Sequence, residues 1–426
     1  MAQQLNEQQF KIRFQKQVIS YLLDKYERSQ AFKSGQPTGQ RPQFALKDSP
    51  FWSDYSDEMD FRKRDWMNEV LAALAQQGVV SLKWERFREG KLLAKVYLEW
   101  DALTDAYHLA GREPKQVKLE RLREILRPLA VHPWDWVRRF WQEAEEKLAM
   151  RQSAGLALDD PDGYADLVRV LQALPKLEET GRPKRLFSQE LFHDSKHFER
   201  HVQKRLISLL RTYGEQEMET EEEYLDSVGL VENPRHVWLS GALVLEIGGQ
   251  RVETEGFAGG VGLSAVSIRE MKVVGINVRR IVTIENLTSF HQWVQKRAGR
   301  SELVLYTGGF PHRTLQLFLQ KLADFFAQQS LAIPVGHWGD VDLGGIRIFQ
   351  FLKSRFFPHL QPILMDVPTL EACRERAVQA DEKYVEKAKI MREEPQFAEW
   401  REVLDWMAQH RLRLEQESIV AIPEDV

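Results

Sequence analysis

Apolar residues in the C-terminal half of the chain fall into two alternating patterns. Short runs rich in β-branched residues predict buried strands, and longer segments with apolar residues three or four positions apart predict helices. Strands that alternate with helices predict a parallel sheet with helices on both faces. The predicted strands are Ile281–Ile284, Leu303–Tyr306, Ala332–Gly336 and Pro362–Met365, and the predicted helices are Leu287–Arg297, Arg313–Gln328 and Gly344–Arg355.

Two further patterns flank this region. The segment Val237–Val252 is predicted to form a β-hairpin that turns at Gly248 and Gly249, because apolar runs lie on both sides of the two glycines. The residues after position 370 are predicted to form charged helices that cap the sheet. Pro334 weakens the prediction of a strand at its position, because proline cannot donate to a strand ladder.

The N-terminal third predicts helices followed by a hairpin. Helices are expected at Phe10–Tyr26 and Arg64–Gln77, and residues 36–60 are expected to form a loop because they are rich in Pro, Gly, Ser and Asp. Val79–Trp84 and Leu92–Leu98 predict the hairpin. This outline is that of a winged helix, although other folds combine helices with a hairpin in the same way.

The expected fold class is a multidomain chain that combines α+β and α/β parts. Residues 1–112 are predicted to form a winged-helix-like arm, residues 113–230 a helical region, and residues 231–426 the α/β domain. A chain of 426 residues is long for a single core, which favours several domains.

Charge and composition exclude some classes of protein. The formal net charge of −4 argues against a protein that coats nucleic acid through its overall charge, but it leaves room for a local basic groove. No apolar stretch is long enough to span a membrane, and the polar N-terminus shows no secretory signal. The single cysteine, Cys373, excludes an intrachain disulfide, so a reducing, cytoplasmic location is expected.

Basic and acidic residues are separated in the middle of the chain. The charged residues among positions 182–211 are mainly Lys and Arg. An acidic run, Glu215–Asp226, follows and predicts a solvated linker or the start of a helix. Lys196, Arg200 and Lys204 are candidates for contacts with DNA phosphates. A basic helix face that is merely solvated explains Arg200 and Lys204 equally well, and a helix start beside an N-cap at Asp194 or Ser195 explains Lys196.

Three carboxylates follow predicted strands of the α/β domain. Glu285 comes directly after Ile281–Ile284, and Asp340 and Asp342 follow Ala332–Gly336. The carboxyl ends of neighbouring parallel strands share one edge of the sheet, where ligands bind in such folds. Clustered carboxylates repel each other, and a divalent cation relieves that repulsion. Hard oxygen donors select Mg²⁺, for which Mn²⁺ is expected to substitute.

Several other polar residues lie close to this edge in the sequence. Arg313 and Arg347 stand at predicted helix starts and are candidates for phosphate binding, with structural salt bridges as the alternative. His337 is a candidate for proton transfer, although a histidine in a loop usually has no such role. An Asp-x-Asp pair by itself is most often a solvated turn or a helix N-cap.

Motifs around these residues resemble the JetD family, also called MksG or EptD. The resemblance rests on ENLTSF (285–290), YTGGFP (306–311) and WGDVDLGGIRI (338–348), with FHDSK (192–196) and LEQE (414–417) in addition. It implies a fold related to the A subunit of topoisomerase VI. Such a fold has a winged-helix or CAP-like DNA-binding region followed by a Toprim domain, which is a Rossmann-like parallel sheet. It also implies a homodimer in which Glu285, Asp340 and Asp342 are the metal-centred catalytic acids.

The resemblance implies a function and partners as well. JetD proteins are the nuclease subunits of Wadjet, an SMC-type anti-plasmid defence system, so cleavage of double-stranded circular DNA is expected. The implied partners are an SMC-like ATPase, a kleisin and an accessory subunit. The chain lacks a GxxxxGK[ST] loop, so any use of ATP is expected to lie with those partners.

Two alternative functions stay open. One is a topoisomerase VI-like transesterase that uses a tyrosine nucleophile. The expected Arg-Asp/Glu-x-Tyr-Tyr type of motif is absent, and Tyr107 lacks the preceding arginine, which favours hydrolysis. The other alternative is a DNA-binding scaffold subunit without catalytic activity.

Overall fold

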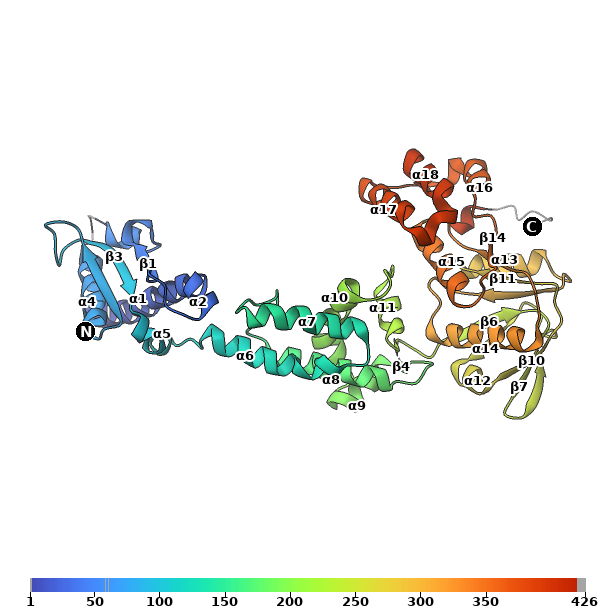
Figure 1. Ribbon diagram of the computed structural model, residues 1–426, viewed down its shortest axis with the longest axis horizontal. Coiled ribbons are helices and arrows are strands. Elements are labelled where there is room, and N and C mark those ends of the chain that lie inside the picture. Colours follow the sequence, from blue (N-terminus) through green and yellow to red (C-terminus); the bar gives the residue numbers. More distant parts are fainter. Residues whose placement is uncertain (1, 58, 60, 420–426) are drawn as a thin grey trace. The chain divides into compact units, whose positions relative to one another are not determined.

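The computed structural model describes residues 2–57, 59 and 61–419, with the backbone alone for residues 2–6 (Figure 1). Contacts divide the chain into two compact units, Met1–Val168 and Arg169–Val426. The division falls inside the helical region, within α8 (Pro161–Ala173). No helix among the described residues is long and apolar enough to cross a membrane.

Unit 1 contains a small antiparallel sheet and the helices packed around it. The sheet has the order β1-β3-β2, and the long helix α1 packs against α4 and α5. Val18, Ile19 and Leu22 of α1 are fully buried in this core. The elements are α1 (Ala2–Glu27), α2 (Gln30–Ser34), β1 (Gln43–Ala45), α3 (Trp52–Tyr55), α4 (Arg62–Gln76), β2 (Val80–Trp84), β3 (Leu93–Leu98), α5 (Leu103–Ala110), α6 (Lys115–Leu126) and α7 (Asp135–Ala149).

The expected helices and the β2–β3 hairpin of unit 1 are confirmed. The expectation of a loop across residues 36–60 is wrong, because β1 and α3 lie within this range. Phe44 of β1 pairs with Val96 of β3 and is buried, so this strand contributes to the core despite the turn-forming residues around it. The winged-helix character of the unit stays a prediction.

Unit 2 begins with helices and continues into the sheet region. Its first elements are β4 (Arg182–Pro183), α9 (Lys184–Phe192), a π-helical turn (Phe198–Val202), α10 (Gln203–Tyr213), α11 (Glu221–Ser227) and β5 (Leu230–Val231). The strands that follow are β6 (His236–Ser240), β7 (Leu243–Ile247), β8 (Gln250–Glu253), β9 (Val261–Ser264), β10 (Lys272–Ile276), β11 (Arg280–Ile284), β12 (Glu302–Tyr306), β13 (Val335–Trp338), β14 (Gln361–Pro362), β15 (Val378–Gln379) and β16 (Leu412–Arg413). The helices among them are α12 (Ala265–Glu270), α13 (Leu287–Lys296), α14 (Arg313–Gln329), α15 (Leu343–Arg355), α16 (Val367–Ala372), α17 (Glu382–Glu393) and α18 (Arg401–His410).

The main sheet of unit 2 is mixed. Its order is β14-β13-β11-β12-β6-β9 in the described part of the chain, with parallel pairing from β14 to β12 and antiparallel pairing for β6 and β9. The predicted alternation of strands and helices is confirmed for the parallel part. The strand order reverses at β11, because β12 pairs on one side of it and β13 on the other. Ligands of open α/β sheets bind at such a reversal, beyond the carboxyl ends of the strands.

Three of the strand predictions need correction. Residues 237–240 belong to β6 of the main sheet, so only β7 and β8 form the hairpin that turns at Gly248 and Gly249. β13 begins at Val335 and continues to Trp338, later than predicted; the Pro334 carbonyl accepts from the Ile281 N–H, but proline has no N–H with which to extend the ladder. β14 is reduced to Gln361–Pro362.

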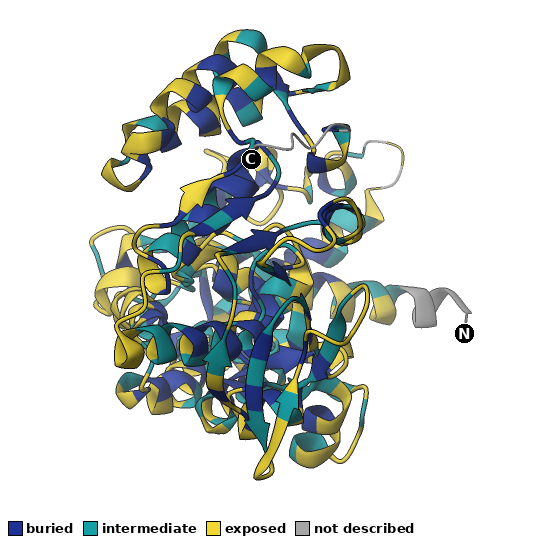
Figure 2. Cartoon of the chain, turned by 90° about the vertical axis from the view of Figure 1, so that its right-hand side faces the viewer, coloured by how far each residue is buried: buried dark blue, intermediate teal, exposed yellow. Residues whose placement is uncertain are grey.

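Helices bury the sheet, as the dark strands in Figure 2 show. Trp293 of α13, Phe318 of α14 and Phe349 of α15 are fully buried in one apolar cluster. The helices α17 and α18 add to it, and the ring of Trp400 lies 4.9 Å from that of Phe349. The prediction of charged helices after position 370 is confirmed.

Removal of the Phe349 ring tests this core. We expect Phe349→Ala to lower the free energy of unfolding of unit 2 by about 3–5 kcal/mol, because the change leaves a cavity beneath α15. Urea denaturation followed by tryptophan fluorescence measures the loss. The matched control is Ile390→Ala on the exposed side of α17, where we expect a change within about 0.5 kcal/mol. Equal losses for the two variants would contradict the packing described.

Candidate functional site

The parallel pairing of β11 and β13 sets two carboxylates side by side. Ile284 and Trp338 are register partners at the carboxyl ends of these strands. The ladder extends by one bond, since the Glu285 N–H donates to the Trp338 carbonyl over 3.0 Å. Glu285 therefore lies at the sheet edge opposite the loop that carries Asp340.

Direct hydrogen bonds orient both carboxylates. The Asp340 N–H donates to Glu285 Oε2 over 3.1 Å, and the Gln416 N–H donates to Asp340 Oδ1 over 2.6 Å. One oxygen of each carboxylate is thus held by backbone. The second oxygens, Glu285 Oε1 and Asp340 Oδ2, accept no hydrogen bond from the residues that the structure describes, and they are available to a ligand.

Gln416 joins the two strand ends from a distant part of the chain. Its side chain is fully buried, donates to the Trp338 carbonyl over 2.7 Å and accepts from the Asn286 N–H over 2.8 Å. The segment that carries it is fixed by a two-way backbone pairing between Leu414 and Val341. Gln416 was not among the residues predicted for the site, and the only pattern that pointed to it was the LEQE motif (414–417).

Asp342 has a different environment from Asp340. It is the N-cap of α15, with Oδ1 accepting from the Gly345 N–H over 2.8 Å, and its Oδ2 lies 3.4 Å from Arg413 Nη1. Both of its oxygens are therefore engaged. The helix cap that the sequence left open as an alternative is present, and Asp342 still lies close enough to act electrostatically on Glu285 and Asp340.

The site holds its carboxylates in an unfavourable environment. Burial, followed by the negative charges of Asp340 and Asp342, raises the pKa of Glu285 well above its ordinary value. Burial also raises the pKa of Asp340, to about 7. The hydrogen bond from Gln416 lowers this pKa, and the charge of Asp342 raises it. These shifts mean that ionisation of Glu285 and Asp340 is opposed, first by burial and then by the neighbouring carboxylates.

His337 is buried beside the acidic pair. Its Nδ1 lies 2.8 Å from Thr283 Oγ1, whereas its Nε2 has no hydrogen-bond partner in the described part of the chain. Burial lowers its pKa to about 3, so the ring is neutral. A Cβ on Gly339 would lie 2.8 Å from His337 Nε2 and 2.5 Å from Glu285 Oε2, so both atoms border the same glycine.

A fourth carboxylate comes from outside the sheet. A Cβ on Gly344 would overlap Glu219 Oε1 and lie 3.3 Å from Asp342 Oδ1, so Glu219 and Asp342 face each other across this glycine. Burial, then the charges of Asp342 and Glu223, raise the pKa of Glu219. The sequence placed Glu219 in an acidic run that predicted a linker or a helix start, and no local pattern linked it to Asp342.

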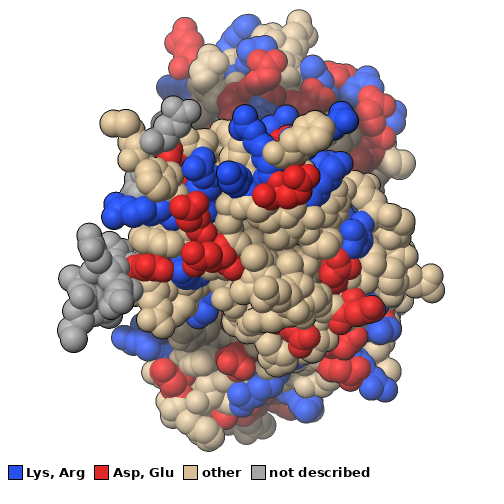
Figure 3. Space-filling view, turned by 90° about the vertical axis from the view of Figure 1, so that its left-hand side faces the viewer, with Lys and Arg blue, Asp and Glu red and all other residues tan. Residues whose placement is uncertain are grey.

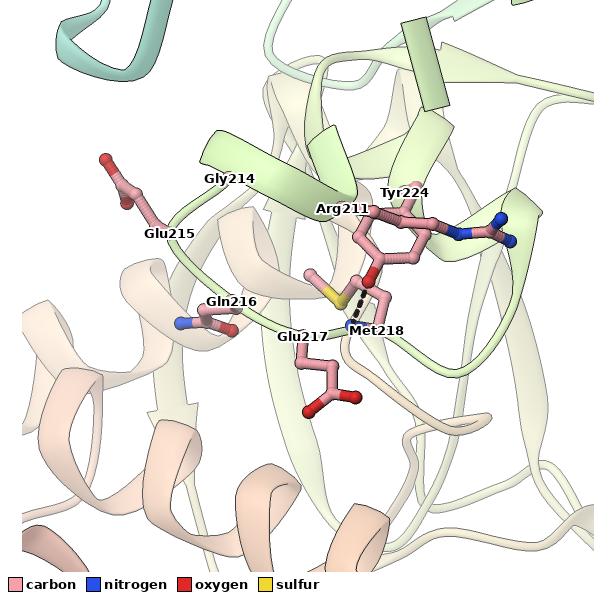
Figure 4. Close-up of a pocket in the computed structure, with 7 residues that line it drawn as sticks. All are labelled: Arg211, Gly214, Glu215, Gln216, Glu217, Met218 and Tyr224. Atoms are coloured by element: carbon pink, nitrogen blue, oxygen red, sulfur yellow. Dashed lines mark hydrogen bonds between the residues drawn. The ribbon is translucent and has the colours of Figure 1, made fainter. Parts of the chain in front are cut away.

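The segment that carries Glu219 also lines a small pocket (Figure 4). The Met218 N–H donates to the Tyr224 hydroxyl over 3.1 Å, and the guanidinium of Arg211 lies over the Tyr224 ring. Glu217 lies on the same segment and forms ion pairs with Arg347 and Lys387. These contacts fix the segment at the beginning of α15.

The candidate phosphate-binding residues separate into two groups. Arg347 is paired with Glu217, and Arg313 is half-buried, with its backbone N–H donating to Asp226 Oδ1 over 2.9 Å. Burial lowers the pKa of Arg313, while the nearby Asp226 acts in the opposite direction. The Arg347 guanidinium is thus paired, whereas Arg313 Nη1 is buried without a hydrogen-bond partner among the described residues.

The other group, Lys196, Arg200 and Lys204, is exposed along the segment from α9 to α10. Arg200 approaches Asp194 at 3.7 Å. On the face drawn in Figure 3, basic side chains lie among acidic ones rather than in a uniform field. A role of these three residues in DNA binding stays a prediction.

Comparison with known proteins identifies the family. Residues 241–424 match the family model described as "Wadjet protein JetD, C-terminal", and residues 18–211 match that of an uncharacterized N-terminal region conserved in bacteria. The chain is 37% identical over 408 residues to the Wadjet protein JetD of Bacillus cereus (strain Q1), which covers 96% of this chain and 98% of that protein. The chain belongs to the JetD family. This confirms the resemblance seen in the sequence.

The carboxylate oxygens of this JetD-family site are the kind of ligand that a hard cation prefers. No group of three His, Cys, Asp or Glu side chains among the described residues is placed to hold a metal ion as it stands. Mg²⁺ commonly uses only one or two carboxylates and completes its shell with water and phosphate oxygens. The free oxygens of Glu285 and Asp340 meet that smaller requirement.

The raised pKa of Asp340 predicts a dependence of stability on pH. The pKa of the Asp340 carboxyl is about 7 in the folded protein and about 4 in the unfolded chain. The carboxyl therefore stabilises the fold at low pH, and this contribution is lost as the pH rises through about 7. In EDTA, we expect Asp340→Asn to gain stability relative to the unchanged chain between pH 5 and pH 8, on the order of 2 kcal/mol. Urea denaturation at both pH values measures the difference. A difference that does not change with pH would show that Asp340 titrates normally.

The crowding around Gly339 predicts a steric effect. We expect Gly339→Ala to destabilise the protein by about 1–3 kcal/mol, because the new methyl group would push the Glu285 carboxylate away from the Asp340 N–H. Gly256→Ala is the control, since open space surrounds that glycine. Thermal denaturation compares the two variants, and an unchanged melting temperature for Gly339→Ala would contradict the close approach.

Proposed function

We propose that this chain is the DNA endonuclease subunit of a Wadjet defence complex. In this proposal, the α/β part of unit 2 is a Toprim domain that hydrolyses phosphodiester bonds of double-stranded circular DNA with Mg²⁺, or with Mn²⁺ in its place. The observation that carries the proposal is the pair Glu285 and Asp340, which lies where the strand order reverses and has one free oxygen on each carboxylate.

Family membership supports the biological setting. The relative that aligns along nearly the whole chain is named a Wadjet protein JetD. We extend this setting to a homodimer that works with an SMC-like ATPase, a kleisin and an accessory subunit. The formal net charge of −4 agrees with a subunit that receives DNA from such partners rather than gathering it alone.

The residues of the chain have separable roles in this reaction. A bound divalent cation supplies Lewis acidity toward a phosphoryl oxygen. Glu285 and Asp340 present their free oxygens to it, and the backbone N–H groups of Asp340 and Gln416 hold these carboxylates in position. Asp342 fixes the start of α15 and adds negative charge to the site.

Tyrosine transesterification has weaker support. The Tyr107 hydroxyl donates to Glu27 over 2.8 Å, and the residue is buried. Burial and the contact with Glu27 raise the pKa of Tyr107, which opposes formation of the phenolate nucleophile. Hydrolysis is therefore the function that we propose.

Cleavage of closed circular plasmid by the reconstituted complex tests the proposal. We expect cutting with Mg²⁺ or Mn²⁺ and none with EDTA. We expect Glu285→Gln to lower the cleavage rate at least about 100-fold, because the change replaces a negatively charged cation ligand with a neutral one. Glu270→Gln, an exposed position on α12, is the control and should cut normally. Full activity of Glu285→Gln would favour a scaffold role for this site, and a covalent protein–DNA adduct would favour the transesterase.

A further inference from the structure

The segment 214–220, which connects α10 to α11, is fixed against the helices beyond the sheet. Glu217 accepts from Arg347 of α15 over 2.7 Å and from Lys387 of α17 over 2.6 Å. These two ion pairs link the connecting segment to helices that follow it by more than a hundred positions in the chain. The position of the connecting segment is therefore set by α15, the helix that begins at the acidic site.

A capping box fixes the end of the connecting segment. The Glu223 N–H donates to Thr220 Oγ1 over 3.2 Å, and Glu223 Oε2 accepts from the N–H groups of Thr220 and Glu219. The backbone at Glu219 is thus held on both sides, by the ion pairs of Glu217 before it and by the capping box after it. Rotation of the Glu219 side chain is therefore what moves its carboxylate.

This backbone arrangement directs the Glu219 carboxylate to the beginning of α15. Gly344 leaves the space that the carboxylate occupies, and Asp342 borders the same space. The charge of Glu219 also acts on Glu285, so the carboxylate is within electrostatic reach of both ends of the acidic site. Glu219 remains more than a third exposed and is open to solvent on its outer side.

The Glu219 carboxylate is uncommitted. No donor among residues 2–57, 59 and 61–419 forms a hydrogen bond with its oxygens. The two arginines that act on it are engaged elsewhere, Arg347 with Glu217 and Arg413 with Asp342. Two carboxylates that face each other repel, and a cation bound between them relieves that repulsion.

The buried imidazole of His337 indicates independently that this edge takes a ligand. The residue is completely buried, and its Nε2 lacks a partner while it lies beside the Glu285 carboxylate at Gly339. Buried polar atoms are almost always hydrogen-bonded in folded proteins. A cation and its water shell would supply polar atoms at this edge.

We propose that Glu219 is a further carboxylate of the cation site, supplied from the connecting segment and facing Asp342 at the beginning of α15. This inference rests on the proposed function and extends it. Both oxygens of Asp342 already have partners, Gly345 and Arg413. The oxygens of Glu219 accept no hydrogen bond from the described residues, so they are free to take a cation ligand position beside Asp342.

Binding of Mn²⁺ to the full-length chain, followed by the loss of the free-ion EPR signal, tests the inference without any cleavage reaction. We expect Glu219→Gln to weaken Mn²⁺ affinity by about 10-fold or more, because one coordinating charge is removed. Glu222→Gln, an exposed neighbour that faces Arg235, is the control, and we expect it to change the affinity by less than about 2-fold. Circular dichroism checks that each variant is folded.

A second variant separates coordination from a general effect of charge. Gly344→Ala keeps every carboxylate but places a methyl group where the Glu219 oxygen lies. Because alanine favours a helix more than glycine does, the variant should fold, and we expect it to weaken Mn²⁺ binding as Glu219→Gln does. Normal affinity in Gly344→Ala together with weak binding in Glu219→Gln would reduce Glu219 to a source of bulk charge and overturn the inference.

Glu285→Gln completes the experiment. If Glu285→Gln weakens Mn²⁺ binding and Glu219→Gln does not, the proposed cation site stands and the role of Glu219 is refuted. If the unchanged chain binds no Mn²⁺ in a saturable way, both the cation site and the inference fail.

Discussion

The parallel pairing of β11 with β13 is the constraint on which the acidic site depends. It brings the ends of two strands, more than fifty residues apart in the chain, to one edge in a register that leaves Glu285 beside Asp340. The cost is a pair of carboxylates whose charges oppose ionisation in a partly buried place. Much of the surrounding structure, including the bridging amide of Gln416 and the cap on α15, serves to hold these charges in position.

The sequence predicted this part of the site because strands, helices and carboxylates follow local rules. An apolar run with an acid at its end is visible without any knowledge of distant contacts, and three short motifs then indicated the JetD family. The boundary of β13 was misplaced because the paired residues begin at Val335, and Pro334 has no N–H with which to extend the ladder. Residues 237–240 were misplaced because hairpin patterning cannot tell which sheet a strand joins.

The residues that the sequence could not place are those defined by long-range contacts. Gln416 and Glu219 lie in segments without periodicity, and each reaches the site from more than sixty residues away from the nearest carboxylate. The same limit applies to charge, since the sequence alone could not show that Arg347 pairs with Glu217. The sequence gives the number of charged residues, but which of them form ion pairs depends on the fold.

The dependence of Asp340 on the Gln416 N–H has a consequence for biosynthesis. Residue 416 is translated after the whole parallel sheet, and it must leave the ribosomal tunnel before it can bridge Trp338 and Asn286. A nascent chain therefore carries the carboxylates of the acidic edge for some time without their final arrangement. Order of synthesis alone thus delays the final arrangement of this edge until the segment around Gln416 has been made.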